Sequence, residues 1–195
     1  MANMESLEEL LQEELKDMYD AEKQLTKALP KLAKKATTPD LQDAFEEHLR
    51  QTEQHMERLE QVFDQLGMPV KGKTCKGMKN LIAEGNDMIA DADDDATRDA
   101  IMIAAAQKVE HYEIAAYGTM RTWANVLGHR EIASMLEDTL EEEKETDQKL
   151  TGIAEGFVNQ AAAEDEEEEE PRKRTVGARA SRRPAAADRN RTGRR

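Results

Sequence analysis

Apolar side chains recur at intervals of three and four residues along four long stretches of the chain. These stripes run over residues 7–32, 41–66, 100–124 and 132–157. The spacing places the apolar side chains on one face of an α-helix, whereas a half-buried strand would alternate at every second residue. The pattern therefore predicts four long amphipathic helices.

Residues typical of helix ends stand at the boundaries of these stretches. Ser6 followed by Glu9 has the form of a capping box. Pro39 occupies a position typical of the first turn of a helix. Gly67 and Gly128 follow the second and third stripes, where glycine commonly ends a helix. The predicted helices therefore have defined starts and stops.

The lengths of the connections predict how the four helices are arranged. The first and third connections are short, so each joins an antiparallel pair. Residues 67–95 are enough to return along a helix of about 40 Å, and they contain a short amphipathic piece at residues 78–89. The expected fold is an all-α, ferritin-like four-helix bundle with up-down-down-up topology, whose long crossover contains a short extra helix.

The composition supports a helical protein. Of the 195 residues, 38% are hydrophobic and 4% are aromatic, and Ala, Leu, Met, Glu, Lys and Gln dominate. The one cysteine, Cys75, excludes an intrachain disulfide framework and a multi-cysteine metal cluster. Apolar runs are too short for a membrane span, and the N-terminus lacks the apolar stretch of a signal peptide. We therefore expect a cytoplasmic protein with no membrane partner.

Charge is distributed unevenly along the chain, whose formal net charge is −14. Residues 172–195 contain ten of the 28 Lys and Arg residues and one of the 42 acidic residues, so they carry +9 and the preceding residues −23. Because this tail has almost no large apolar side chains, it cannot form a core. The sequence predicts a bundle over residues 1–160 and a disordered tail over residues 161–195, acidic first and then arginine-rich.

Acids and histidines interrupt all four apolar stripes. Buried carboxylates without a partner are costly, and several of them converging from different helices would repel one another unless a multivalent cation lay between them. Carboxylate oxygens with one or two imidazoles suit Fe or Mn. The sequence therefore predicts a site for one or two Fe or Mn ions, bridged by carboxylates. The candidate ligands are Glu22, His48, His55, Glu110, Glu113, Glu143 and Asp147.

A plainer interpretation is that some of these acids face solvent, because a phase error of one residue moves a side chain from the core to the surface. Glu14, which also interrupts the first stripe, is the weakest candidate. The metal hypothesis depends on helix register. If the two hairpin turns lie where proline and glycine indicate, Glu22 is opposite the region of His55. Glu113 is then opposite Glu143, so the candidates cluster around one layer.

Three segments also resemble a known family. They are YDAEKQLTKALPKLAKKA (19–36), AAAQKVEHYEIAAYGT (104–119) and LEDTLEEEKETDQKLT (136–151). These motifs are similar to those of the YciE/YciF-type ferritin-like stress proteins, and the similarity covers residues 4–160. The resemblance implies a helical bundle related to rubrerythrins, usually a homodimer, with a di-iron-type site. It maps that site onto Glu22, His48, Glu110, Glu113, Glu143 and Asp147.

The chain departs from that family's pattern beside the site. Where relatives read HLEET, this chain reads HLRQT, so Gln51 replaces an acid and offers only a neutral carbonyl oxygen. The Glu-x-x-His pairs typical of di-iron bundles are also incomplete. Thr52 stands where an acid would precede His55, and no imidazole follows Glu143 because position 146 is Thr146. The number of bound ions, one or two, stays open.

One further motif, Gly67–Thr74, fits the P-loop formula G-x-x-x-x-G-K-[ST]. A P-loop follows a buried strand and begins a helix, so that backbone N–H groups bind phosphate. Here a predicted helix precedes the motif, and Pro69 removes one backbone donor. We therefore predict a flexible start to the crossover rather than a nucleotide site.

Two functions are compatible with these features. In the first, a reduced metal pair reacts with O2 or peroxide in a stress-related role, and whether this makes the protein an enzyme is open. Tyr19, Tyr112 or Tyr117 then either relays protons or electrons or simply packs. In the second, the bundle is a scaffold without metal, and the tail at 172–195 binds nucleic acid through its phosphates without base specificity.

Overall fold

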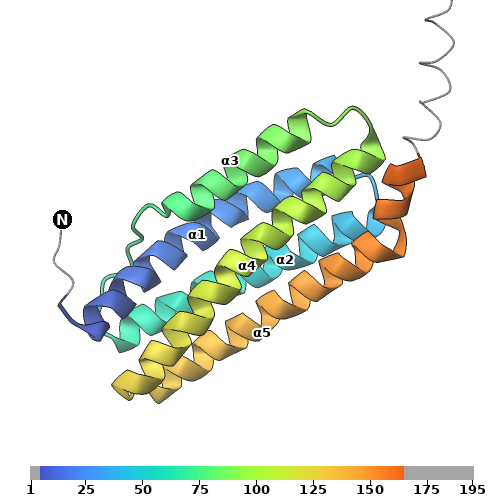
Figure 1. Ribbon diagram of the computed structural model, residues 1–195. Helices are drawn as coiled ribbons and strands as arrows, with labels where there is room; N and C mark the ends of the chain where they lie inside the picture. Colours follow the sequence, from blue (N-terminus) through green and yellow to red (C-terminus); the bar gives the residue numbers. More distant parts are fainter. Residues whose placement is uncertain (1–4, 165–195) are drawn as a thin grey trace, which may run out of the picture.

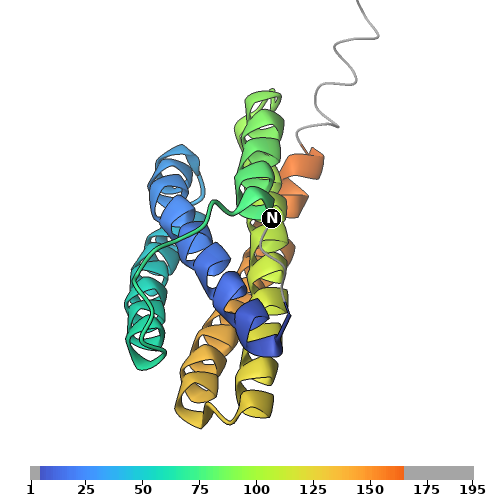
Figure 2. The same ribbon diagram turned by 90° about the vertical axis from the view of Figure 1, so that its left-hand side faces the viewer.

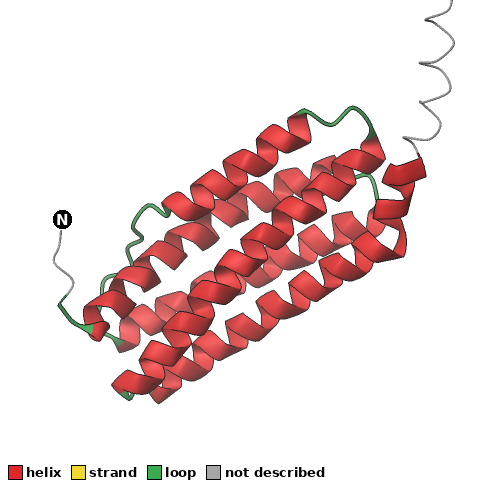
Figure 3. Cartoon of the chain, viewed as in Figure 1, coloured by secondary structure: helices red, strands yellow, loops and turns green. Residues whose placement is uncertain are grey.

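The structure of the protein is a computed structural model, which describes residues 5–164. The chain forms a long bundle of helices (Figure 1), and no strand occurs among the described residues (Figure 3). None of the helices in this range combines the length and the hydrophobicity that crossing a membrane requires. The elements are α1 (Leu7–Lys35), α2 (Pro39–Gln65), α3 (Lys76–Ala90), α4 (Asp95–Leu127), α5 (Arg130–Ile153) and the π-helical turn η1 (Ala154–Val158).

Each of the four long helices runs antiparallel to the long helices that it contacts (Figure 1). α1 packs against α2 and α4, and α5 packs against the same two helices. α2 and α4 therefore run in the same direction, and α3 occupies the crossover between them, beside α4 and α1 (Figure 2). The predicted all-α bundle with up-down-down-up topology is confirmed. Residues 67–74 form a loop that follows a helix, so the strand that a P-loop requires does not precede them.

The helix ends have the capping features that the sequence predicts. Ser6 Oγ accepts a hydrogen bond from the Glu9 N–H at 3.1 Å and so caps α1. Pro39 is the first residue of α2, where its missing N–H breaks no helical hydrogen bond. Gly67 and Gly128 follow α2 and α4 with φ angles of 64° and 87°, a left-handed conformation that other residues rarely adopt.

A buried aspartate ties the first hairpin turn to the start of α4. Asp99 is fully buried, and its carboxylate accepts hydrogen bonds from the backbone N–H groups and the hydroxyls of Thr37 and Thr38, at 2.7–3.2 Å. Thr38 therefore directs its hydroxyl to Asp99 and does not cap α2. These charge-assisted hydrogen bonds fix the α1–α2 hairpin against α4.

Apolar layers lie on both sides of a polar layer within the bundle. In α1, buried Leu15 precedes the buried Glu22 along the helix, and buried Leu29 follows it. In α2, Phe45 and Phe63 lie on either side of two buried histidines. Packing of such apolar faces supplies most of the stability of helices in proteins. The apolar layers therefore fix the helix backbones from which the polar layer projects.

α4 is buried on a broader face than its predicted stripe. It contacts α1 and α5 within the bundle and α3 on the outer side of the bundle. Met102 and Val109, which lie outside the predicted stripe, are buried as a result. Four predicted members of the stripe are only partly buried, because three neighbouring helices rather than one determine burial: Ala100, Gln107, Ile114 and Arg121.

A π-helical turn changes the helix phase near the end of the bundle. η1 places an extra residue in its turn, so Val158 is buried and Phe157, predicted to face the core, is 64% exposed. Helical structure continues to residue 164, four residues beyond the predicted end of the bundle at residue 160. The rest of the predicted tail lies outside the described residues.

We predict that Asp99→Asn lowers the free energy of unfolding of the metal-free protein by about 2 kcal/mol, because the amide accepts weaker hydrogen bonds and its NH2 group opposes other donors. Chemical denaturation followed by circular dichroism measures this change. The control is Asp93→Asn, at an exposed loop position, which should change stability by less than about 0.5 kcal/mol. Equal effects of the two substitutions would contradict the role of Asp99.

Candidate metal centre

Six of the seven predicted ligands lie in one buried layer of the bundle, and each is at most 3% exposed. The spacing of the residues along each helix explains this convergence. Two residues that are three or seven apart share a helix face, so each of α2 and α4 directs two side chains inward. The six come from all four long helices: Glu22 from α1, His48 and His55 from α2, Glu110 and Glu113 from α4, and Glu143 from α5.

The first group of ligand atoms belongs to Glu22, His55 and Glu143, and these atoms all lie within 4.8 Å of one another. His55 Nδ1 is 3.0 Å from Glu143 Oε1 and 3.5 Å from Glu22 Oε1. One imidazole nitrogen and two carboxylates therefore face a common point between α1, α2 and α5.

The second group belongs to His48, Glu110, Glu113 and Glu143, again with ligand atoms within 4.8 Å of one another. His48 Nε2 is 3.2 Å from Glu110 Oε1 and 4.0 Å from Glu143 Oε2. Glu143 thus directs one oxygen toward each histidine and is the residue that the two groups share. A shared carboxylate of this kind is suited to bridging two cations.

Most of the polar atoms in this layer lack a hydrogen-bond partner among the described residues. They include Glu22 Oε2, Glu110 Oε2, both carboxylate oxygens of Glu113 and both of Glu143. The close pair between His55 Nδ1 and Glu143 Oε1 also lacks the angles of a hydrogen bond. Buried polar atoms are almost always paired in proteins, and leaving them unpaired is costly. This cluster of unpaired acceptors is therefore an arrangement that a cation would satisfy.

The carboxylates in this layer perturb one another's ionisation. Burial raises the pKa of Glu113 well above its usual value, and the nearby charges of Glu143, Glu22 and Glu110 raise it further. Burial likewise raises the pKa of Glu143, although the close approach of His55 opposes this. Without a cation, full ionisation of the layer is therefore unfavourable. A bound divalent cation would reverse this preference by stabilising the ionised carboxylates.

A carboxylate outside the layer orients His55. Glu142 Oε2 lies 2.8 Å from His55 Nε2, and Arg58 donates two hydrogen bonds to the same carboxylate at 2.9 and 3.1 Å. With Nε2–H donated to Glu142, the Nδ1 lone pair is left for a metal, the arrangement typical of histidine ligands. Hydrogen bonding from His55, followed by Arg58, lowers the pKa of Glu142 to about 2. Sequence analysis missed Glu142, because it is partly exposed and belongs to an unbroken run of acids.

The other ring nitrogen of His48, Nδ1, faces an uncharged side chain. Thr146 Oγ1 is 3.5 Å from His48 Nδ1 and donates a hydrogen bond to Gln51 Oε1 at 3.3 Å. The neutral amide of Gln51, which the sequence analysis singled out beside the site, is therefore engaged with Thr146. Burial lowers the pKa of His48, but the charge of Glu110, which lies 3.2 Å from His48 Nε2, outweighs burial and raises the value to about 9.

One of the three tyrosines considered from the sequence contacts the site. Tyr117 is fully buried, and its hydroxyl donates a short hydrogen bond to Glu22 Oε1. Burial raises the pKa of Tyr117, and the charge of Glu22 adds to this. Tyr19 instead donates to Glu60, and Tyr112 lies between Asp17 and Cys75.

The structure does not place Asp147 in either group of ligand atoms. Its Oδ1 accepts a hydrogen bond from Gln107 at 3.1 Å, and its Oδ2 lies 3.4 Å from His111 Nε2. The phase of α5 explains this position, because Thr146 rather than Asp147 is buried one turn after Glu143. Glu14, the weakest candidate from the sequence, is partly buried and likewise belongs to neither group.

The donor set fits divalent transition-metal ions. Four carboxylates and two imidazoles offer mainly oxygen ligands with some nitrogen, which suits Fe and Mn. The four-helix arrangement also matches the general pattern of carboxylate-bridged metal centres in bundles, although this chain has Glu110 and Glu113 on one helix in place of a Glu-x-x-His pair. The unpaired oxygens described above are the observation of this structure that supports the fit.

Comparison with known proteins places these features in a family. The chain is 47% identical over 161 residues to protein YciF of Escherichia coli K12, covering 82% of this chain and 97% of YciF. It superimposes on the crystal structure of YciF, which is described as a stress protein, with a TM-score of 0.77 over 80% of this chain and 99% of that chain.

A second solved structure is also similar. YcfI of Rhodopseudomonas palustris, described as a candidate structural protein, is 43% identical, with a TM-score of 0.75 over 76% of this chain and 95% of that chain. These similarities confirm the resemblance found in the sequence motifs. Because its residues 6–163 match the family described as Domain of unknown function (DUF892), the chain belongs to that family of YciF-like helical-bundle proteins.

Proposed function

We propose that this protein binds two Fe or Mn ions in the buried layer and reacts with O2 or peroxide in a stress-related role. The observation that carries the proposal is the convergence of six buried ligand residues from four helices, most of whose polar atoms lack a hydrogen-bond partner among the described residues. The stress-related role is supported by the description of YciF, its relative, as a stress protein.

The two groups of ligand atoms divide the proposed centre between two ions. Glu22, His55 and one oxygen of Glu143 would hold the first ion, whereas His48, Glu110 and Glu113 would hold the second with the other oxygen of Glu143. When bound in their reduced state, such ions supply the electrons for reaction with O2 or peroxide. Because no second cysteine exists in the chain, an outside reductant would have to restore that state.

Residues around the layer have separate tasks in this proposal. Arg58 and Glu142 hold the His55 ring so that Nδ1 faces Glu22 and Glu143. Tyr117 donates a hydrogen bond to Glu22 and so holds a proton at the edge of the site. The apolar layers on both sides exclude water from the ligands and strengthen their electrostatic interaction with a cation.

A second candidate function is that of a scaffold, and the description of YcfI as a candidate structural protein favours it. In this alternative, the arginine-rich residues 172–195, which lie outside the described range, bind nucleic acid without base specificity. The homodimer and the cytoplasmic location stay predictions under both functions.

Glu143→Gln should weaken binding of Mn²⁺ at both positions, by tenfold or more, because Glu143 is the residue that the two groups share. Titration of the untagged, chelator-treated protein by calorimetry, together with elemental analysis, measures affinity and stoichiometry. Glu145→Gln is the matched control, since Glu145 is exposed on the same helix. Unchanged Mn²⁺ binding by Glu143→Gln would refute the proposed centre.

Glu113→Gln should stabilise the metal-free protein by about 1 kcal/mol at pH 7, and so raise Tm by roughly 2–4 °C, because it removes an unpaired buried carboxylate. The folded-state pKa of Glu113 lies above its usual value of 4.5, so ionisation lowers the stability of the wild type as pH rises above 4.5. The variant lacks this loss. It should also gain less stability from added Mn²⁺ than the wild type.

Calorimetric melting with and without Mn²⁺, at pH 5 and pH 7, tests both effects of Glu113→Gln. Glu145→Gln should show neither effect, because its side chain is exposed. A loss of stability in the metal-free variant would mean that the Glu113 carboxylate is paired in a way that the structure does not indicate.

Truncation after Glu170 tests the second candidate function. Under the scaffold hypothesis, the full chain binds duplex DNA at low salt with steep salt dependence, and the truncated chain loses that binding because its remaining residues are strongly acidic. Electrophoretic mobility shift at two salt concentrations measures the difference. Identical DNA retention by the two chains would refute nucleic-acid binding by the tail.

A further inference from the structure

A pocket of about 240 Å³ lies between α1, α3 and α4. Most of its wall is aliphatic, with Leu25 of α1, Ile82 of α3 and Val109 of α4 among the lining residues. Two residues of the buried layer, His48 and Glu110, also line it. The pocket therefore connects the surface beside α3 with one of the two proposed ion positions.

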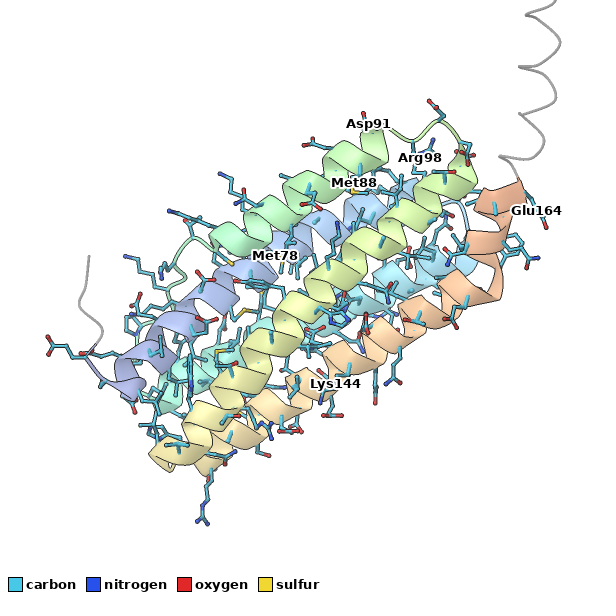
Figure 4. The ribbon with its side chains drawn as sticks, viewed as in Figure 1. Met78, Met88, Asp91, Arg98, Lys144 and Glu164 are labelled. Atoms are coloured by element: carbon cyan, nitrogen blue, oxygen red, sulfur yellow. The ribbon has the colours of Figure 1, made fainter. Side chains whose placement is uncertain are left out.

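Small side chains explain why the pocket forms at this place. α3 packs mainly against α4, and a Cβ added to Gly85 would lie 3.0 Å from Ala105 Cβ, so the glycine permits this close approach. Ala28 on α1 and Ala106 on α4 also line the pocket, and their short side chains leave its interior open. α3 is amphipathic along its length, with Met78 buried and Met88 39% exposed (Figure 4).

The inner end of the pocket is acidic, and polar atoms there lack hydrogen-bond partners among the described residues. Glu110 is 1% exposed, and its Oε2 has no hydrogen-bond partner among the described residues. His48 is 3% exposed, and its Nε2 likewise has no hydrogen bond within the described part of the chain. Glu113 and Glu143 belong to the same group of ligand atoms. An anionic group is therefore unfavourable at this end of the pocket.

The outer end of the pocket is cationic. Lys27 and Lys31 line it, are both exposed and lie one helical turn apart on α1. Neither forms a salt bridge with another described residue, although the chain is strongly acidic overall. The charge of the pocket thus changes from positive at the surface to negative inside, with an aliphatic wall between.

We propose that this pocket binds a medium-chain aliphatic carboxylate, with the carboxylate at Lys27 and Lys31 and the alkyl chain extending toward His48 and Glu110. Charge complementarity determines the orientation, because the lysines attract the head group. The acids of the buried layer repel it in the metal-free protein, and with two divalent ions bound their four negative charges leave no net positive charge to attract it. The inference deepens the proposed function by naming its ligand class, and it rests on that function only for the statement that the chain end lies beside bound ions.

The size of the pocket sets the chain length. A volume of about 240 Å³ holds roughly eight groups the size of a water molecule, which corresponds to a chain of about eight carbons. Each methylene added between butanoate and octanoate should tighten Kd roughly fourfold, because it removes apolar surface from water. Chains much longer than the pocket should bring no further gain.

Calorimetric titration of the full-length, metal-free protein with sodium octanoate tests the site without relying on metal. Ala28→Trp should fill the pocket and weaken octanoate binding at least tenfold. Ala33→Trp is the matched control on the same helix, because Ala33 lines a separate hollow between α1 and α2. Equal binding by wild type and Ala28→Trp would overturn the proposal, and circular dichroism checks that both variants fold.

The head-group position has its own test at two residues that are exposed. Lys27→Glu combined with Lys31→Glu should weaken octanoate binding at least tenfold but change binding of 1-octanol less than twofold. If both ligands are unaffected, or both weaken equally, the proposed orientation is wrong. This test also decides the matter if Ala28→Trp does not fold.

The orientation of bound octanoate is measured by proton NMR in protein loaded with Mn²⁺. This ion is paramagnetic and broadens the signals of the protons nearest to it. The terminal methyl of octanoate should broaden more than its α-methylene protons. The reverse order would overturn the proposal. Failure of Mn²⁺ to bind in a separate titration would refute the proposed metal centre alone, since octanoate binding to the metal-free protein is measured independently.

Discussion

The structure depends on keeping several carboxylates and two imidazoles in a dry layer between apolar ones. Burying one carboxylate is unfavourable, and burying four together adds mutual repulsion. The helices therefore have to be held by other contacts, which the apolar layers and the Asp99 link to the first hairpin turn provide. Rigid backbones on both sides explain how Glu113 can stay buried although neither of its carboxylate oxygens has a hydrogen-bond partner within residues 5–164.

Much of this arrangement follows from local rules that can be applied to the sequence. α2 illustrates this, because seven of the eight positions in its predicted stripe from Leu41 to Leu66 are buried in the structure and the eighth, Leu66, is partly buried. The hairpin turns at Pro39 and Gly128 fix which helix levels face each other. Helix period and turn position together therefore predict that Glu22, His55 and Glu143 meet, without knowledge of any side-chain contact.

The residues that sequence reasoning misplaced depend on contacts between distant segments. α4 packs against α1, α3 and α5 and also contacts η1, so a single stripe underestimates its buried face. The π-helical turn η1 rotates Phe157 away from the core, and the spacing of apolar residues does not predict this local change in helix type. Glu142 lies within a run of acids, and its role depends on Arg58 from another helix. Asp147 lies four residues after Glu143, which is slightly more than one helical turn. The resulting rotation around the helix axis places Asp147 beside Gln107.

The surroundings of the buried layer differ on its two sides, and this asymmetry follows from topology. Between α2 and α5, polar side chains close the bundle, with Arg58 and Glu142 bound to one another and Thr146 bound to Gln51. Between α1 and α4, the up-down-down-up topology requires a long crossover, and that crossover places α3 over the groove. Because α3 approaches α4 closely at Gly85, it covers this side with an aliphatic wall and leaves a pocket rather than a sealed core. The same connection that makes α2 and α4 parallel thus determines the side from which a small molecule reaches His48 and Glu110.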